Sequence, residues 1–454
     1  MSNRIAIIGG GPAGYVAAIR AAQLGGAVTL IESNAIGGVC TNCGCIPTKT
    51  YYHYAEILHD LKTAVSDRIF EGEISHDWLR MLRKKDMIVK RLVKGIEYLM
   101  KKNEIRVFDG TGELAGNNRI AVRLRDGSTD TVEYDELLIA TGSASRNLPI
   151  EGWDGSGIWS STEALNAQSA PESLIIIGGG VIGCEFAHIF STFGTKVTII
   201  EVMDSILPGI DPDIVAAVTK ALAAEGVAIR TGVGINKIER ISNGIIATAG
   251  DEQFEAMEIM AAVGRTPTPP AGIENSGVSI AKGAIFVDGN ATAAGNIWAA
   301  GDVCGAPYLA HWASAMGEVA VENMFGAGKS LNRNAIPGAF FTALEVGTVG
   351  LTEPEAKNRF GEIMVGMFPY QASGRAKTAS AASGFAKVIA KKDNTIIGIH
   401  IAGRGASEML GAAGVAVTHG LNVDDWRETI VAHPTFGEIL REAALDAVGE
   451  AFHK

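Results

Sequence analysis

The chain has 454 residues, of which 47% are hydrophobic and 20% charged, and a formal net charge of −11. This length exceeds what one hydrophobic core holds, so we expect two to four domains. The acidic balance argues against a nucleic-acid partner, and no apolar run reaches the roughly 20 residues of a membrane span. The chain enters a strand within its first residues and shows no secretory leader, so we expect a cytoplasmic protein.

The first 32 residues predict a dinucleotide-binding unit. An apolar run at 4–8 predicts a buried strand, a glycine turn and an amphipathic helix follow, and a second strand ends at Glu32. The glycines of such a unit allow a tight turn, backbone contact with a pyrophosphate and close packing of helix on strand, while the acid binds a ribose diol. The pattern G-x-G-x-x-G is met by Gly9, Gly11 and Gly14.

The same construction recurs near residue 180, with Gly178, Gly180 and Gly183. Glu201 follows the first of these glycines by 23 residues, the interval that also separates Gly9 from Glu32. One such motif in a chain with 56 glycines is a weak signal, but two matching units indicate two dinucleotide sites, with FAD and NAD as an obvious pair. Because no Arg or Lys occurs in the four residues after Glu201, we expect the second site to prefer NAD(H) to NADP(H).

Three of the five cysteines, Cys40, Cys43 and Cys45, lie within six residues. The following residues have the apolar spacing of a helix, and Pro47 suits its first turn. A helix N-terminus stabilises a thiolate, so a cysteine here can serve as a nucleophile or a flavin partner. A zinc site usually has four ligands, and Cys184 and Cys304 stand apart in the sequence, so we expect no metal.

The chain resembles the pyridine nucleotide-disulfide oxidoreductases of class I, and most closely the dihydrolipoamide dehydrogenases among them. The resemblance spans essentially the whole chain. Besides the glycine loops it rests on GGVCTNCGCIPTK (37–49), LLIATGS (137–143), AAVGRTP (261–267), AAGDVCGAPYLAH (299–311) and VAHPTFGEILREAAL (431–445). It implies an α/β fold with two Rossmann-like dinucleotide-binding domains and an α+β C-terminal dimerisation domain, and FAD and NAD as cofactors.

The resemblance also implies a division of the chain. The expected segments are an FAD-binding domain at 1–145, an NAD-binding domain at 146–270, a central domain at 271–335 that completes the FAD site, and an interface domain at 336–454. In the last segment the residue patterns of 339–357 and 384–403 predict alternating strands, with a turn at Asp393–Asn394 and helices from Ala406 onward.

The resemblance assigns catalytic roles to residues of this chain. Cys40 matches the interchange thiol that attacks the substrate disulfide, and Cys45 matches the charge-transfer thiol that lies against the flavin. Lys49 and Glu185 match an ion pair beside the flavin ring. Cys43 stands where the family usually has an apolar residue, so we interpret it as a bystander, although a third thiol can in principle exchange disulfides with Cys40.

The resemblance also implies which residues contact the cofactors and which form an acid-base pair. The residues expected at FAD are Gly9, Gly11, Gly14, Glu32, Gly142 and Asp302, and those expected at NAD are Gly178, Gly180, Gly183 and Glu201. His433 and Glu438 match the family's acid-base dyad, a histidine whose charge is set by a carboxylate. In that family the dyad completes the disulfide site of the other subunit, which implies a homodimer.

The function implied by the resemblance is oxidation of dihydrolipoamide by NAD⁺ through a Cys40–Cys45 disulfide. The partner would be a lipoyl domain of a 2-oxo-acid dehydrogenase or of the glycine cleavage system. An NADH-dependent reductase of another low-molecular-weight disulfide is the alternative. A flavin-binding scaffold with vestigial chemistry is a third reading, and the joint presence of Cys40, Cys45, His433 and Glu438 speaks against it.

The chain departs from the family pattern at several positions. Val431 stands where a histidine often precedes the catalytic one, and FTALEV (341–346) replaces a segment that commonly contains proline. Neither change removes an expected catalytic group. The chain ends in GEAFHK without a cysteine pair, which argues against mercuric reductases and high-molecular-weight thioredoxin reductases. The lack of basic residues after Glu201 argues against glutathione reductase.

Overall fold

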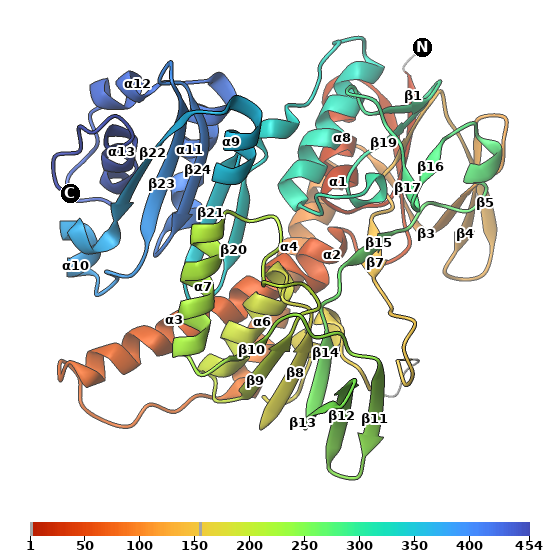
Figure 1. Ribbon diagram of the computed structural model, residues 1–454. Helices are drawn as coiled ribbons and strands as arrows, with labels where there is room; N and C mark the ends of the chain where they lie inside the picture. Colours follow the sequence, from red (N-terminus) through yellow and green to blue (C-terminus); the bar gives the residue numbers. More distant parts are fainter. Residues whose placement is uncertain (1–2, 154–156) are drawn as a thin grey trace.

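The computed structural model describes residues 3–153 and 157–454. An eight-stranded sheet of order β18-β19-β6-β1-β2-β3-β4-β5 forms its first body (Figure 1). Its strands are β1 Arg4–Ile8, β2 Ala27–Glu32, β3 Arg106–Leu114, β4 Arg119–Leu124, β5 Thr129–Glu133, β6 Glu136–Ile139, β18 Thr292–Ala294 and β19 Ile297–Ala299. Its helices are α1 Pro12–Gln23, α2 Gly38–Cys43, α3 Cys45–Ser66, α4 Trp78–Lys102 and α8 Ala310–Met324.

The first strand-turn-helix unit forms where the sequence predicts it. Strand β1 pairs in parallel with β2 and β6, and its residues Ile5–Ile8 are buried. Gly9 has φ +106°, and a Cβ there would lie 2.2 Å from the carbonyl oxygen of Ala140. A Cβ on Gly14 would lie 1.7 Å from the carbonyl oxygen of Gly9. The tight turn and the close packing of α1 on β1 therefore both require glycine.

A four-stranded parallel sheet of order β10-β9-β8-β14, flanked by the antiparallel sheet β11-β12-β13, forms the second body. Its strands are β8 Ser173–Ile177, β9 Lys196–Ile200, β10 Ala228–Arg230, β11 Lys237–Ile241, β12 Gly244–Ala249, β13 Glu252–Ala256 and β14 Glu258–Ala261. Its helices are α5 Ser161–Leu165, α6 Val181–Thr192 and α7 Pro212–Ala224. The ribbon of β7, Ser143–Ser145, with β15, Arg265–Pro267, links it to the first body.

The C-terminal body is an antiparallel sheet of order β20-β21-β24-β23-β22. Its strands are β20 Gly338–Phe341, β21 Glu345–Gly350, β22 Ile363–Pro369, β23 Phe385–Lys391 and β24 Ile396–Ala402. Its helices are α9 Glu353–Phe360, α10 Gly374–Thr378, α11 Ala406–His419, α12 Val423–Glu428 and α13 Gly437–Asp446. The remaining short elements are β16 Ile280–Ala281, β17 Ala284–Ile285, η1 Ile273–Asn275, η2 Asp302–Cys304, η3 Arg333–Ala335 and η4 Tyr370–Ala372.

The strand prediction for 339–357 was wrong at its C-terminal end. Strands β20 and β21 account for the segment as far as Gly350, but α9 begins after Thr352. The hydroxyl of Thr352 accepts a hydrogen bond from the backbone N–H of Glu355, whose carboxylate accepts the N–H of Thr352 in return. This capping box, with Pro354 in the first turn, starts a helix where a strand was expected.

A buried lysine joins the second body to the C-terminal body. The Nζ atom of Lys387 in β23 lies 2.9 Å from Oδ1 of Asp211, 2.6 Å from Oδ2 of Asp213 and 2.7 Å from Oε2 of Glu353. Asp211 caps the N-terminus of α7 and is fully buried. The two bodies thus share a charged contact in which Lys387 and Asp211 are buried and Asp213 is half-exposed.

The domain boundaries expected from the sequence stay a prediction. The order of strands in the eight-stranded sheet is relevant to them. The chain leaves the eight-stranded sheet after β6 and re-enters it at β18 and β19, so residues around 292–299 belong to the same sheet as the N-terminal strands. Within the described residues no helix is long and apolar enough to cross a membrane.

Candidate active site

Cys40 and Cys45 lie on either side of a sharp turn between two helices. Helix α2 ends at Cys43, and α3 begins at Cys45 after Gly44, whose backbone has φ −141° and ψ −108°. The side-chain amide of Asn42 donates hydrogen bonds to the carbonyl oxygens of Ala35 and Ile36 in the preceding loop and, at 2.9 Å, to that of Gly38 in the first turn of α2. The thiols of Cys40 and Cys45 are free and share a hydrogen bond. The turn therefore holds the two predicted redox cysteines together.

The surroundings shift the pKa values of the two thiols in opposite directions. The hydrogen bond from Cys40 lowers the pKa of Cys45 to about 7, with burial opposing this shift and the charge of Lys49 assisting it. The same hydrogen bond, together with burial, raises the pKa of Cys40. The reduced pair therefore carries its negative charge on Cys45 and its proton on Cys40.

An ion pair between two helices stands beside the cysteine pair. The Nζ atom of Lys49 in α3 lies 2.7 Å from Oε1 and 2.9 Å from Oε2 of Glu185 in α6, and Glu185 is buried. From β20, the backbone N–H of Phe341 donates to Oε1 of Glu185 at 3.0 Å, and Lys49 Nζ lies 4.6 Å from the centre of the Phe341 ring. The three bodies of the fold thus meet at this pair. Sequence reasoning singled out FTALEV as a departure but missed this role of Phe341.

The first glycine loop fits the pyrophosphate of a dinucleotide. Gly11 precedes helix α1 and provides no side-chain cap, so N–H groups of the first turn remain available to an anion. The carboxylate of Glu32 accepts hydrogen bonds from the N–H groups of Gly10, at 2.6 Å, and Asn34, at 2.7 Å. Glu32 thereby braces the loop and keeps acceptor capacity for a ribose diol.

The second glycine loop repeats this geometry. Gly180 precedes helix α6 and provides no side-chain cap, and a Cβ on Gly180 would meet no atom within 4 Å. The carboxylate of Glu201 accepts the N–H groups of Gly179, at 2.6 Å, and Met203, at 2.8 Å. A Cβ on Gly183 would lie 2.0 Å from the carbonyl oxygen of Gly178, as in the first loop. The two loops are built alike and can hold one dinucleotide each.

Asp302 belongs to a polar cluster that sequence reasoning found only in part. The hydroxyl of Ser143 donates to Oδ2 of Asp302 at 2.5 Å, and Nε of Arg265 donates to the Ser143 hydroxyl at 2.7 Å. Nε of Arg265 also lies 3.7 Å from the Asp302 carboxylate. Gly142, next to this cluster, has φ +74°, a conformation that favours glycine. Ser143 and Arg265 stand inside quoted motifs, so the signal for them was present.

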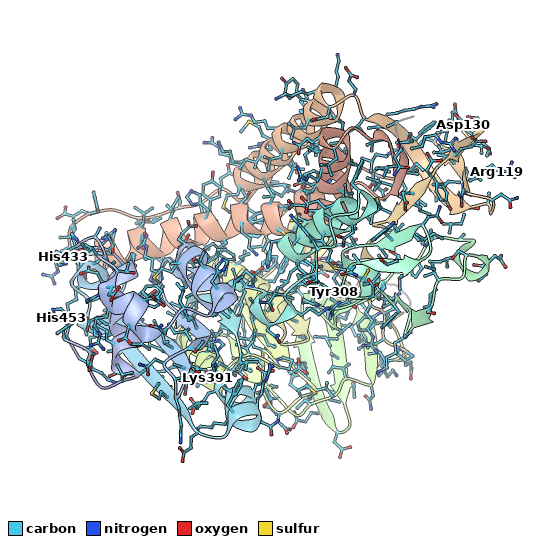
Figure 2. All side chains as sticks on the ribbon, turned by 90° about the horizontal axis from the view of Figure 1, so that it is seen from above. Arg119, Asp130, Tyr308, Lys391, His433 and His453 are labelled. Carbon is cyan, nitrogen blue, oxygen red and sulfur yellow. The ribbon has the colours of Figure 1, made fainter. Side chains whose placement is uncertain are left out.

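His433 and Glu438 form a hydrogen-bonded pair on the C-terminal body. Nδ1 of His433 lies 2.9 Å from Oε1 of Glu438, and the backbone N–H of Thr435 donates to Oε2 at 2.9 Å. Burial raises the pKa of Glu438, but these two hydrogen bonds outweigh it and the net shift is downward. The His433 side chain is 78% exposed at one edge of the molecule, together with His453 (Figure 2). Within one chain no hydrogen bond or ion pair of the described residues joins the dyad to Cys40 or Cys45.

The remaining two cysteines and two tyrosines near the redox turn are partly or fully buried. Burial raises the pKa of Cys184 and of Cys304 to about 12 in each case, so both thiols are held neutral. Tyr51 and Tyr52 of α3 are buried and belong to the hydrophobic core. No group of three or more His, Cys, Asp or Glu side chains within the described ranges is arranged to hold a metal ion.

Comparison with known proteins agrees with this geometry. Residues 3–317 match the family Pyridine nucleotide-disulphide oxidoreductase, and residues 336–444 match its dimerisation domain. The chain is 36% identical over 456 residues to dihydrolipoyl dehydrogenase of Bacillus subtilis, covering 99% of each chain. Its fold is similar to LpdA of Mycobacterium tuberculosis, with TM-score 0.92, 28% identity, and 97% of this chain and 99% of the other covered. It is also similar to a Cu(II) complex of the HOCl-induced flavoprotein disulfide reductase RclA of Escherichia coli, with TM-score 0.89, 28% identity, and 98% and 99% covered.

Proposed function

The chain belongs to the pyridine nucleotide-disulphide oxidoreductase family, and on this premise we propose that it oxidises dihydrolipoamide with NAD⁺ through a Cys40–Cys45 disulfide. It is a dihydrolipoyl dehydrogenase-like flavoprotein disulfide oxidoreductase whose cofactors are FAD and NAD(H). Its dimerisation domain supports a homodimer. The proposal adds the substrate, the residue roles, a lipoyl domain of a 2-oxo-acid dehydrogenase or glycine cleavage complex as partner, and a cytoplasmic site of action.

The observation that carries the proposal is the unequal pair of thiols beside the Lys49–Glu185 ion pair. In the proposed step a substrate thiolate attacks the sulfur of Cys40, the Cys40–Cys45 bond breaks, and Cys45 leaves as a thiolate. Its pKa of about 7 makes Cys45 the better leaving group of the two. The second substrate thiolate then displaces Cys40, which yields cyclic lipoamide and the reduced cysteine pair.

His433 handles the protons in this proposal. The substrate thiol must lose a proton before it attacks, and the ring nitrogen of His433 that does not face Glu438 accepts it. Glu438 holds the other ring nitrogen and stabilises the resulting imidazolium. Because His433 is exposed and shares no hydrogen bond or ion pair with Cys40 or Cys45 of its own chain within the described residues, the proposal has it serve the partner subunit.

The two glycine loops would hold the cofactors. Gly9, Gly11, Gly14 and Glu32, with Gly142 and Asp302, would bind FAD, and Gly178, Gly180, Gly183 and Glu201 would bind NAD. FAD, when bound, supplies the two-electron link between the thiolate of Cys45 and the nicotinamide. Lys49 stabilises that thiolate, and Glu185 orients Lys49. The buried Glu201 carboxylate favours NAD(H), since it would face the 2′-phosphate of NADP(H).

A second candidate function runs in the opposite direction, with NADH reducing another low-molecular-weight disulfide. The similarity to the disulfide reductase RclA supports it.

Turnover of dihydrolipoamide with NAD⁺ should be compared directly with turnover of NADH with a panel of small disulfides. We expect dihydrolipoamide to be oxidised with the higher kcat/KM, and Cys45→Ser to abolish this activity. Cys43→Val is the matched control and should leave kcat within about twofold, because Cys43 makes no contact that the mechanism uses. Negligible dihydrolipoamide turnover by the holoenzyme would overturn the proposal in favour of the reductase.

A further inference from the structure

Helix α4 concentrates positive charge in an acidic chain. Its 25 residues include nine Lys or Arg and two Asp or Glu, a net charge of +7. Since the whole chain carries −11, the residues outside α4 carry −18. A charge separation of this kind produces a directional field that orients and attracts a charged partner.

Six of the nine basic side chains of α4 share one exposed face, whereas Lys85 is buried. At 3.6 residues per turn, positions three, four and seven residues apart lie on the same side of a helix. The basic stripe is defined by six exposed residues, Arg83, Lys84, Lys90, Arg91, Lys94 and Lys101. None of these six is in an ion pair with the described part of the chain. Their charges are therefore free to meet a partner.

Two large side chains interrupt the charges along the stripe. Met87 is 38% exposed and Tyr98 is 64% exposed, and the helical spacing places both between the basic residues. Tyr, Met and Arg are enriched in protein–protein interfaces relative to the rest of a protein surface. A stripe that combines them has the composition of an interface.

The opposite face of α4 supports the redox turn. Helix α4 packs on α2 and α3, beside which it lies in Figure 1. Ile96 is buried, and its Cδ1 lies 3.0 Å from the position a Cβ would take on Gly37, the residue that caps α2. The stripe therefore faces outward about one helix diameter, ~10 Å, from the helix that carries Cys40.

We propose that the basic stripe of α4 docks a small acidic protein domain that carries the dithiol substrate. This inference rests on the proposed function, in which the dithiol is attached to a lipoyl domain. The stripe is about 30 Å long, from the 1.5 Å rise per helical residue. A compact domain of about 100 residues has a radius of gyration of about 13 Å, so one such domain covers the stripe.

A small domain fits the charge distribution better than an extended polyanion. A membrane surface or a long nucleic acid would extend beyond α4 over the rest of the chain, whose net charge of −18 repels polyanions. The apolar side of α4, with Trp78, Met81 and Ile96, is buried in the fold and is unavailable for insertion into lipid. A small acidic domain can contact the stripe, in which Glu97 is the acidic residue nearest to Lys94 and Lys101, without covering the rest of the chain.

The test compares the same dithiol in free and domain-bound form. The charge-reversal variant Lys84→Glu, Lys90→Glu, Lys94→Glu alters the stripe, and Lys220→Glu, Lys196→Glu, Lys377→Glu alters three exposed lysines elsewhere by the same total charge. The substrates are neutral dihydrolipoamide and a reduced, isolated lipoyl domain of net negative charge. kcat/KM is measured with each holoenzyme over a range of ionic strength.

We expect the stripe variant to lose at least about tenfold in kcat/KM toward the lipoyl domain at low salt, with the loss shrinking as salt rises. Its kcat/KM toward free dihydrolipoamide should match wild type, and the control variant should change less toward the domain. Equal turnover of the domain by stripe variant and wild type would overturn the docking proposal while leaving the function intact. Absence of turnover of free dihydrolipoamide by wild type would instead overturn the proposed function.

Discussion

At the scale of single residues, the two redox cysteines are chemically identical and become different through their surroundings. Cys45 opens α3 next to Lys49, whereas Cys40 lies in α2 and shares its proton with Cys45. The pKa of Cys45 falls to about 7 and that of Cys40 rises. The distinction between an attacking thiol and a retained thiolate is thus set mainly by the hydrogen bond between them, since the charge of Lys49 lowers the pKa of both thiols.

The charge on Cys45 predicts a pH dependence. Its thiolate fraction increases as pH rises through about 7, so the long-wavelength thiolate-to-flavin absorption of the two-electron-reduced holoenzyme should grow over the same range. Lys49→Met should move the midpoint upward, because the lysine charge favours the thiolate. Glu185→Gln should move it downward, because the glutamate charge disfavours the thiolate. Anaerobic spectroscopic titration measures all three midpoints, and shifts of the same sign in both variants would contradict this account.

Contacts between residues that are far apart in the sequence could not be predicted from the sequence at this scale. The sequence identified Cys40, Cys45, Lys49 and Glu185 because each stands in a recognisable motif. It did not identify Phe341, whose backbone N–H and ring act on that ion pair from β20. Its contacts with Lys49 and Glu185 exist only once the three bodies have packed, and no local pattern encodes them.

At the scale of secondary structure, most elements follow from local pattern. The two strand-turn-helix units begin and end close to their predicted residues because buried strands, glycine turns and helix ends all have local signatures. The error at α9 came from a capping box that was overlooked in a run of strand-forming residues. The short helix α2 was not expected, since six residues around a cysteine turn carry too little periodicity.

The contact between α7, α9 and β23 predicts a large stability effect. Lys387→Met removes the cation that pairs with the fully buried Asp211, so we expect the free energy of unfolding to fall by about 3–5 kcal/mol. Lys391→Met is the matched control on the same strand, because its pair with Asp393 is largely exposed and is worth at most about 1 kcal/mol. Urea unfolding of both variants measures the difference. Equal losses of unfolding free energy in the two variants would show that the buried pair stabilises the fold no more than the exposed pair does.

At the scale of the whole molecule, the position of the dyad predicts sharing of residues between subunits. Cys45→Ser and His433→Gln should each inactivate a homodimer. When the two chains are co-expressed in equal amounts, random pairing gives half mixed dimers with one intact site of two, or about a quarter of wild-type activity. The measurement is turnover of the co-expressed mixture, with mixed dimers quantified by mass spectrometry. Mixed dimers without activity would place the dyad and the cysteines of a working site in one chain.

The return of the chain to its first sheet has a consequence for biosynthesis. Strands β18 and β19 at residues 292–299 complete a sheet whose centre is β1, so the N-terminal body cannot close until most of the chain has left the ribosome. The parallel sheet of the second body draws only on β8 to β14, residues 173–261, and can form earlier. The ribbon β7–β15 brings the entry and exit of that segment together, as in a domain inserted into a host. We therefore expect the middle of the protein to reach its native structure before its beginning does.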